Sequence, residues 1–182
     1  MSTLNQAYKI EVKRLCSGEI DQSQFLDWLY NKMGAFKVQL HTQNRKKDYM
    51  SGWVDWLEIR ARKYNEHYNH RNICIAEIVF DLDLPGWLME HERLAIVKAT
   101  VRRLKSFHAI HPVVFDTGKG YHLHWFDQEN AVRHFQDTKR DYAESVIKDV
   151  RSDLMKWNSN TMIAIEYSRH WKRNNRVRMI EV

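Results

Sequence analysis

Two aspartates separated by one residue, Asp81 and Asp83, follow an apolar run and are the first candidates for chemistry. Residues i and i+2 of a strand point to the same side, so both carboxylates should project together where the strand ends. Two negative charges held this close repel each other unless a cation lies between them. Carboxylate oxygens suit Mg²⁺ or Mn²⁺, which also bind water and substrate phosphates. The pair therefore predicts a divalent-metal site, although aspartates that only cap a turn would give the same pattern.

A glycine-containing turn, Thr-Gly-Lys-Gly-Tyr-His from Thr117 to His122, is the second candidate. Glycine lets a backbone approach a ligand closely, and we expect Gly118 and Gly120 to present N–H groups to an anion. Lys119 adds a positive charge, Thr117 a hydroxyl and His122 a hydrogen-bond donor. The turn predicts a phosphate-binding site, and a hairpin turn without a ligand is the alternative.

The C-terminal segment combines a carboxylate with basic residues. Glu166 ends an apolar run, and Arg176 and Arg178 alternate along an expected strand, so the two arginines should share one face. They would either neutralise phosphate or be surface charges of an edge strand. The loop between Glu166 and Arg176 mixes basic groups with a tryptophan, which predicts contacts with the phosphates and a base of a nucleic acid. Its basic candidates are Arg169, Lys172 and Arg173.

The elements that must position these groups follow from the spacing of the apolar residues. The first third reads as three helices: one that ends at Gly18, one capped by Asp21, and one over about residues 49–68. The pattern then changes to short β-branched runs and amphipathic helices, which predict an α/β sandwich around a mixed sheet. The expected strands are 73–80, 111–115, 121–126, 162–166 and 176–180. Two helices are also expected: one carries Leu94, Val97, Val101 and Leu104 on one side, and the other spans about residues 129–157.

Composition narrows the class of protein. The formal charge of +6 and a pI of about 9.3 favour an anionic partner, of which nucleic acid is the commonest. No apolar run approaches the roughly 20 residues of a membrane span, and the polar N-terminus does not resemble a signal peptide. Cys16 and Cys74 are isolated, which indicates a reduced, intracellular protein and gives no zinc-site spacing.

Three motifs in this order resemble the archaeo-eukaryotic primase superfamily. The stretch Glu77–Asp83, Glu-Ile-Val-Phe-Asp-Leu-Asp, is similar to its first motif, hydrophobic residues followed by DxD. The later Thr-Gly-Lys-Gly-Tyr-His is similar to the second, a Ser/Thr-Gly turn followed by a histidine on a strand. Glu166 and Arg178 are similar in order and spacing to the third, a carboxylate followed by an arginine motif. The resemblance covers about residues 72–182.

The resemblance implies an α/β (α+β) fold with an RRM-like mixed-sheet catalytic core at residues 71–182. The helical pattern of the first third predicts a helical N-terminal subdomain at residues 1–70. Asp81 and Asp83 would hold catalytic Mg²⁺ or Mn²⁺, with Glu166 as the third carboxylate. His122 would contact the incoming triphosphate. Thr117, Gly118, Lys119 and Gly120 would assist His122, and Arg176 and Arg178 would lie near phosphates.

The activity implied is template-dependent nucleotidyl transfer by a primase or primase-polymerase. Its partners would be nucleoside triphosphates, a single-stranded DNA or RNA template, and a replicative helicase or primase accessory subunit. Primase and repair polymerase share this site, so both stay open. Two departures from the family pattern stand out: the third carboxylate is glutamate in place of aspartate, and no Pro-Gly follows the arginine motif before Val182. The sequence also has no cysteine/histidine zinc knuckle like that of many replicative primases, which points to a small plasmid-, virus- or repair-type member.

Two rival functions use the same residues. His122-Leu123-His124 matches the His-hydrophobic-His pair of rolling-circle nickases, in which both histidines bind one metal and a tyrosine, here Tyr142, attacks the strand. Strand alternation gives this spacing without any metal. The other rival is a nucleic-acid-binding module that kept the fold and lost turnover, which the change to Glu166 favours.

Overall fold

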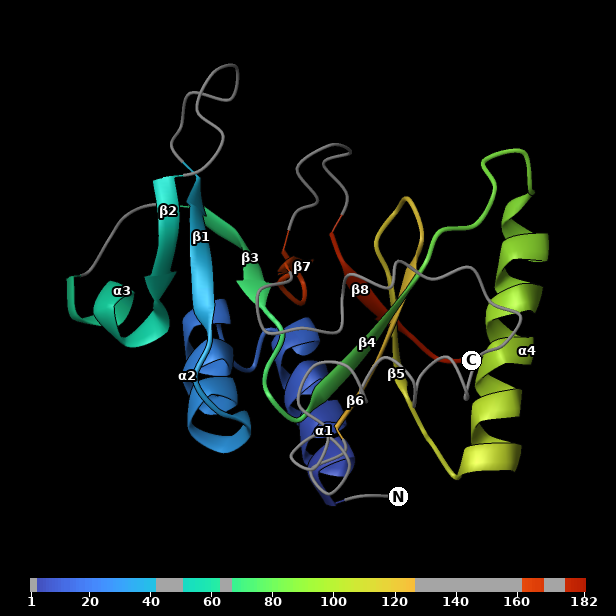
Figure 1. Ribbon diagram of the computed structural model, residues 1–182, viewed down its shortest axis with the longest axis horizontal. Coiled ribbons are helices and arrows are strands. Elements are labelled where there is room, and N and C mark those ends of the chain that lie inside the picture. The colour runs from blue at the N-terminus through green and yellow to red at the C-terminus, as the bar shows by residue number, and fades with distance from the viewer. Residues whose placement is uncertain (1–2, 42–50, 63–66, 127–161, 169–175) are drawn as a thin grey trace.

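The computed structural model describes residues 3–41, 51–62, 67–126, 162–168 and 176–182 (Figure 1). Within them, four helices and eight strands form a mixed α+β architecture with two four-stranded sheets. Sheet A has the strand order β2-β1-β3-β7 and sheet B the order β4-β6-β5-β8. The elements are α1 (Thr3–Ser17), α2 (Gln22–Met33), β1 (Lys37–His41), β2 (Ser51–Asp55), α3 (Trp56–Arg62), β3 (His67–Asn72), β4 (Glu77–Leu82), α4 (Glu90–His108), β5 (Val113–Asp116), β6 (Tyr121–Phe126), β7 (Met162–Ala164) and β8 (Arg178–Ile180).

The first two predicted helices are confirmed. Tyr8, the first of three apolar residues on one face of α1, is fully buried, and Gly18 ends α1 with φ +79°, a conformation that glycine adopts without strain. Asp21 begins α2 through a capping box with Gln24: each side chain accepts a hydrogen bond from the other residue's backbone N–H.

The third predicted helix, over residues 49–68, is wrong. This region instead contains β2, the short helix α3 and the start of β3, and β1 pairs with both strands. Only α3 keeps the helical spacing, and its Trp56 is buried and donates to Asp27 at 2.8 Å. Pairing with neighbouring strands outweighs the local periodicity here. Residues 1–70 are therefore not an all-helical unit, and their sheet also takes β7 from the C-terminal part of the chain.

The mixed sheet expected from the sequence is also wrong, because every strand pairing in the described residues is antiparallel. In sheet B, β4 and β5 both run opposite to β6, which lies between them. Helix α4 returns the chain so that β5 runs in the direction of β4, and a tight turn then inserts β6 between them. The result is a split β-α-β unit in which the end of β4 lies beside the start of β6.

The two faces of sheet B pack against different helices. On one face, Phe80, Leu123 and Trp125 form a core with Val97, Val101 and Leu104 of α4. This confirms the predicted apolar side of the helix except at Leu94, which is only partly buried. On the other face, Phe115 and Phe126 join a core that includes α1 and α2. Figure 1 shows α4 along one edge of the molecule, with sheet B between it and α1. Side chains at alternate positions of a strand therefore point to different sides, one set toward α4 and the other toward α1 and α2.

Candidate functional site

The register between β4 and β6 collects the acidic and histidine side chains on one face of sheet B. Asp81 pairs with His122, and Val79 pairs with His124. Directly paired residues of antiparallel strands point to the same face, and alternate residues of one strand share that face. Glu77, Asp81, His122 and His124 therefore lie on the face turned away from α4.

Asp81 and His122 form the centre of the candidate site. The Nε2 atom of His122 lies 3.4 Å from Oδ1 of Asp81, and the two side chains are 6% and 14% exposed. The ring of His122 also stacks on that of His124, with centroids 5.8 Å apart and planes 26° apart. A carboxylate and an imidazole held together, with the carboxylate reaching solvent, can bind a cation or orient a phosphate group.

Asp83 does not simply continue the alternation of β4. The strand ends at Leu82, and the N–H of Leu84 donates to the carbonyl of Leu82 at 3.1 Å, so the chain turns at Asp83. The Asp83 side chain is 57% exposed, and its Oδ1 lies 3.6 Å from Nζ of Lys119. The two aspartates therefore have different surroundings, one beside a histidine and one beside a lysine.

The turn between β5 and β6 is held by its own polar groups. The N–H of Thr117 donates to the carbonyl of Gly120 at 3.0 Å, and the N–H of Gly120 donates to Oγ1 of Thr117 at 3.0 Å. The N–H of Gly118 donates to Oδ1 of Asp116 at 2.6 Å. The expectation that both glycines present their N–H groups to an anion is therefore wrong, because the turn uses these donors itself.

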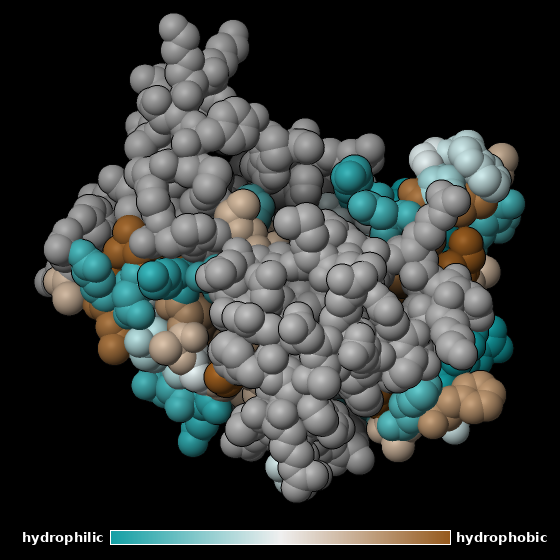
Figure 2. Space-filling view, viewed as in Figure 1, coloured by the Kyte–Doolittle hydropathy of each residue, from teal (hydrophilic) through white to brown (hydrophobic). Residues whose placement is uncertain are grey.

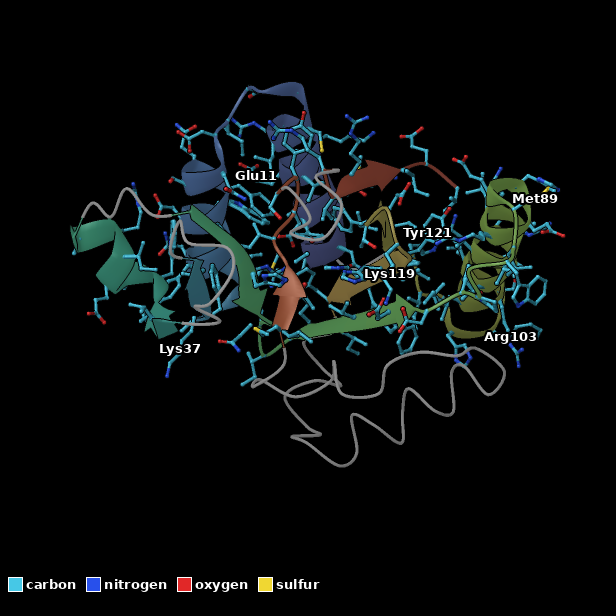
Figure 3. All side chains as sticks on the ribbon, turned by 90° about the horizontal axis from the view of Figure 1, so that it is seen from above. Glu11, Lys37, Met89, Arg103, Lys119 and Tyr121 are labelled. Atoms are coloured by element: carbon cyan, nitrogen blue, oxygen red, sulfur yellow. The ribbon has the colours of Figure 1, made fainter. Side chains whose placement is uncertain are left out.

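Glycine at position 120 has a steric reason. A Cβ on Gly120 would lie 2.8 Å from the carbonyl oxygen of Leu82, closer than such contacts occur. The turn thus packs against the end of β4, which carries Lys119 to Asp83. Arg93 of α4 holds the turn from the other side: its Nη2 donates to the carbonyl of Lys119, and its guanidinium lies 5.6 Å from the ring centroid of Tyr121. Figure 3 shows Lys119 and Tyr121 close together at this end of sheet B.

Neither C-terminal arginine lies on the face of Asp81 and His122. Arg178 pairs with Asp116, which pairs with Tyr121, and Tyr121 pairs with Leu82, so Arg178 belongs to the opposite face of sheet B. The guanidinium of Arg176 lies 4.7 Å from the ring centroid of Tyr167 and donates to its carbonyl. The prediction that both arginines contact phosphates at this site is not supported, because the strand register turns Arg178 away and Arg176 covers Tyr167.

A buried polar network lies next to the candidate site and joins the two sheets. Arg71 of β3 donates to both oxygens of Glu77 at 2.7 and 2.8 Å and also to both oxygens of Glu166. The hydroxyl of Tyr8 donates to Glu166 at 2.5 Å and lies 3.2 Å from Nδ1 of His124. That Nδ1 lies 3.0 Å from Glu77. All five side chains are at most 1% exposed.

The charges of this network stabilise one another. Burial alone would raise the pKa of the Glu77 carboxyl, but the Arg71 guanidinium and the His124 ring hold it well below its usual range. Burial would lower the pKa of Arg71, but Glu166 and Glu77 raise it well above its usual value. Burial, with Glu166 and Glu77 nearby, raises the pKa of Tyr8, so its hydroxyl stays protonated and donates. Glu77 and Arg71 are thus charged within a hydrogen-bonded network in the protein core.

The sequence predicts Glu166 as a third metal ligand beside Asp81 and Asp83. Its surroundings in the structure are different, because it belongs to the buried network with Arg71 and Tyr8. The ligand atoms of Glu77, His124 and Glu166 lie within 4.8 Å of one another, so this group could hold a metal ion. In this structure the guanidinium of Arg71 makes the ion pairs with the same two carboxylates. Within the described ranges, Asp81 and Asp83 belong to no comparable group of three ligands. The described residues thus contain two separate sets of acidic groups. Glu77 and Glu166 form ion pairs with Arg71, whereas Asp81 and Asp83 reach solvent.

Three members of the network, Tyr8, Arg71 and Glu77, were missed from the sequence. Glu77 begins a strand whose next three residues are apolar and buried, and a carboxylate in that position needs a partner. This signal was available, whereas the identity of the partner was not, because Arg71 belongs to the other sheet. Trp125 and Phe126 of β6 are both buried, one on each face of sheet B.

The remaining predicted residues cannot be placed. Arg169, Lys172, Arg173 and Tyr142 lie outside the described residues, as does the helix expected at 129–157. No helix in the described ranges is long and apolar enough to cross a membrane. In comparisons with known proteins, the chain matched no protein-family model, no curated protein and no solved structure. The functional interpretation therefore depends on this chain's own residues.

Proposed function

We propose that the protein is a nucleotidyltransferase that joins nucleoside triphosphates on a single-stranded nucleic-acid template, as a primase or primase-polymerase. The observation that carries the proposal is the pairing of Asp81 with His122 on one face of sheet B, 3.4 Å apart. Asp83 and Lys119 lie at the adjoining end of the sheet. Carboxylates for a cation, an imidazole and an ammonium group for phosphates are thus brought together from two motifs distant in the sequence.

Asp81 and Asp83 would each supply a carboxylate to a divalent ion such as Mg²⁺ or Mn²⁺. Mg²⁺ is usually bound by one or two carboxylates and takes its other ligands from water and substrate phosphates. The partial exposure of Asp81 and the greater exposure of Asp83 leave room for such ligands. When bound, the ion would lower the pKa of an attacking hydroxyl and neutralise charge on the phosphates.

The chain's own groups would bind and orient the triphosphate. Lys119 would exchange its ion pair with Asp83 for one with a phosphate once a cation takes over the aspartate charge. Arg93 holds the carbonyl of Lys119 and so fixes the position of that turn. Once a cation takes over the charge of Asp81, Nε2 of His122 would exchange its contact with that carboxylate for a hydrogen bond to a phosphate oxygen, with the ring held by the stack on His124. Positioning and charge neutralisation supply most of the acceleration in phosphoryl transfer.

A binding module without turnover is the second candidate. The ion pair between Glu166 and Arg71 favours it, because the glutamate that the sequence motif assigns to the metal is engaged elsewhere. The nickase is less well supported: His122 and His124 do share a face, but Nδ1 of His124 faces Glu77 and Tyr8 in the buried network. A metal that must also reach a DNA strand needs an exposed site, and His124 is only 1% exposed.

Nucleotide incorporation on single-stranded DNA, with and without a primer, in Mg²⁺ or Mn²⁺ tests the proposal. We expect metal-dependent products, and a loss of about a hundredfold or more in Asp81→Asn and Asp83→Asn, which keep the shape and remove the charge. Glu181→Gln, a change at a carboxylate that is 76% exposed, is the matched control and should keep full activity. Products without a primer would identify a primase. DNA binding without incorporation under any condition would reject turnover and favour the binding module.

A further inference from the structure

The outer surface of α4 is strongly basic and is not explained by the site on sheet B. From residue 93 to residue 115 the sequence has five lysines or arginines and no aspartate or glutamate. Lys98, Arg102, Arg103 and Lys105 are all exposed. Figure 2 shows hydrophilic side chains along this edge of the molecule, interspersed with hydrophobic ones. Such a surface attracts polyanions.

The C-terminal half of α4 also forms an open hollow. Among the described residues, its lining includes Arg102, Arg103, Ser106, Phe107 and His108. Residues four apart on a helix are neighbours, so Arg102 lies beside Ser106, and Arg103 lies beside Phe107. The hollow thus combines guanidinium groups and a hydroxyl, which bind phosphate, with an aromatic ring.

Phe107 is the unusual member of this group. Its side chain is 77% exposed, although the other large apolar residues in this half of the helix, Val101 and Leu104, are buried against sheet B. Toward the N-terminus, Arg103, Ala99 and Ala95 follow Phe107 at intervals of four residues, and all three are exposed. A strand lying along this side of the helix would therefore reach a hollow that is basic and aromatic.

We propose that this surface of α4 binds single-stranded nucleic acid, with Arg102 and Arg103 on the phosphates and Phe107 stacked on an unpaired base. Basic groups that follow the backbone, combined with an aromatic ring for a base, are how proteins bind single strands without sequence preference. A membrane surface fits less well, because an interfacial helix needs a continuous apolar face toward the lipid. In α4 that face is buried against sheet B.

The inference shares the nucleic-acid partner of the proposed function but requires no catalysis. Binding of a fluorescein-labelled 20-nucleotide single strand is measured by anisotropy, without nucleotide or divalent metal, over a range of salt concentrations. A failure here is thus distinct from a failure of nucleotide incorporation. Far-UV circular dichroism of each variant confirms that it is folded.

Arg102→Gln/Arg103→Gln should weaken binding and reduce its salt dependence. For single strands the slope of log K against log salt is about −0.7 per neutralised phosphate. Losing two contacts should therefore make this slope less negative by about 1.4. At 0.1 M salt this corresponds to a roughly 25-fold higher Kd. Lys32→Gln/Lys37→Gln, which removes two exposed charges far from α4, is the matched control and should change Kd less than twofold.

Phe107→Ala should raise Kd about 5- to 150-fold and leave the salt slope unchanged, because stacking involves no counterion release. The effect should disappear on a duplex, whose bases are already stacked. Equal losses in the Lys32/Lys37 control, an unchanged slope in the arginine variant, or no binding of single strands at low salt would each overturn the proposal. Binding of phosphatidylserine vesicles in preference to the oligonucleotide would overturn it in favour of a membrane surface.

Discussion

Arg71→Met should destabilise the protein far more than removal of an exposed arginine. Arg71 donates to Glu77 at 2.7 and 2.8 Å and to Glu166, and all three side chains are at most 1% exposed. Methionine fills similar space but leaves two buried carboxylates without a cation. Breaking one buried ion pair in this way costs about 3–5 kcal/mol, and a typical domain has about 5–15 kcal/mol of stability in total.

The pH dependence of stability should also change sign. In the wild type, Arg71 and His124 hold the pKa of Glu77 below its usual range against the effect of burial. Its contribution is therefore present above the pKa of an unfolded glutamate, about 4.3, and is lost only as the pH falls below that. Without the guanidinium, burial raises the carboxyl pKa in the folded state. The variant should then become more stable as the pH falls from 8 to 5.

Urea unfolding followed by circular dichroism at several pH values measures both effects. Arg102→Met, on an exposed arginine of α4, is the control and should change stability little. The triple variant Arg71→Met/Glu77→Gln/Glu166→Gln removes the stranded charges and should recover much of the loss, so the test holds even if Arg71→Met does not fold. A loss below about 1 kcal/mol, or the same pH slope as the wild type, would refute the assignment of this network as a buried, ionised group.

Three further predictions concern the turn and the reaction. Gly120→Ala should cost about 1–3 kcal/mol in urea unfolding because of the contact with the Leu82 carbonyl, whereas Gly86→Ala, where a Cβ meets open space, should cost little; equal losses would contradict this. Lys119→Ala should raise KM for the nucleoside triphosphate about tenfold with kcat nearly unchanged in steady-state incorporation assays, and a fall in kcat alone would argue against a role in binding. Tyr142→Phe should keep full nucleotide incorporation, and a covalent DNA adduct in the wild type that this variant lacks would identify a nickase instead.

Much of the local structure was predictable because it depends on neighbouring residues. The capping box at Asp21, the end of α1 at Gly18 and the apolar side of α4 all follow from interactions within a few positions of the chain. The strand at 121–126 was also predicted with its observed bounds. The region 49–68 failed for the opposite reason, since its apolar residues fit a helical spacing while β1, an adjacent strand, pairs with it.

The candidate site divides in the same way. The sequence by itself placed Asp81 and Asp83 at the end of a strand and His122 at the start of another, because both follow from local alternation and turn residues. Tertiary structure alone decided that Asp81 and His122 face each other, since that depends on the register between β4 and β6. It also decided that Glu166 binds Arg71 across 95 positions of the chain, a contact that no local pattern encodes. Burial then requires each of these charges to find a partner, and only the packing of the two sheets determines which partner is within reach.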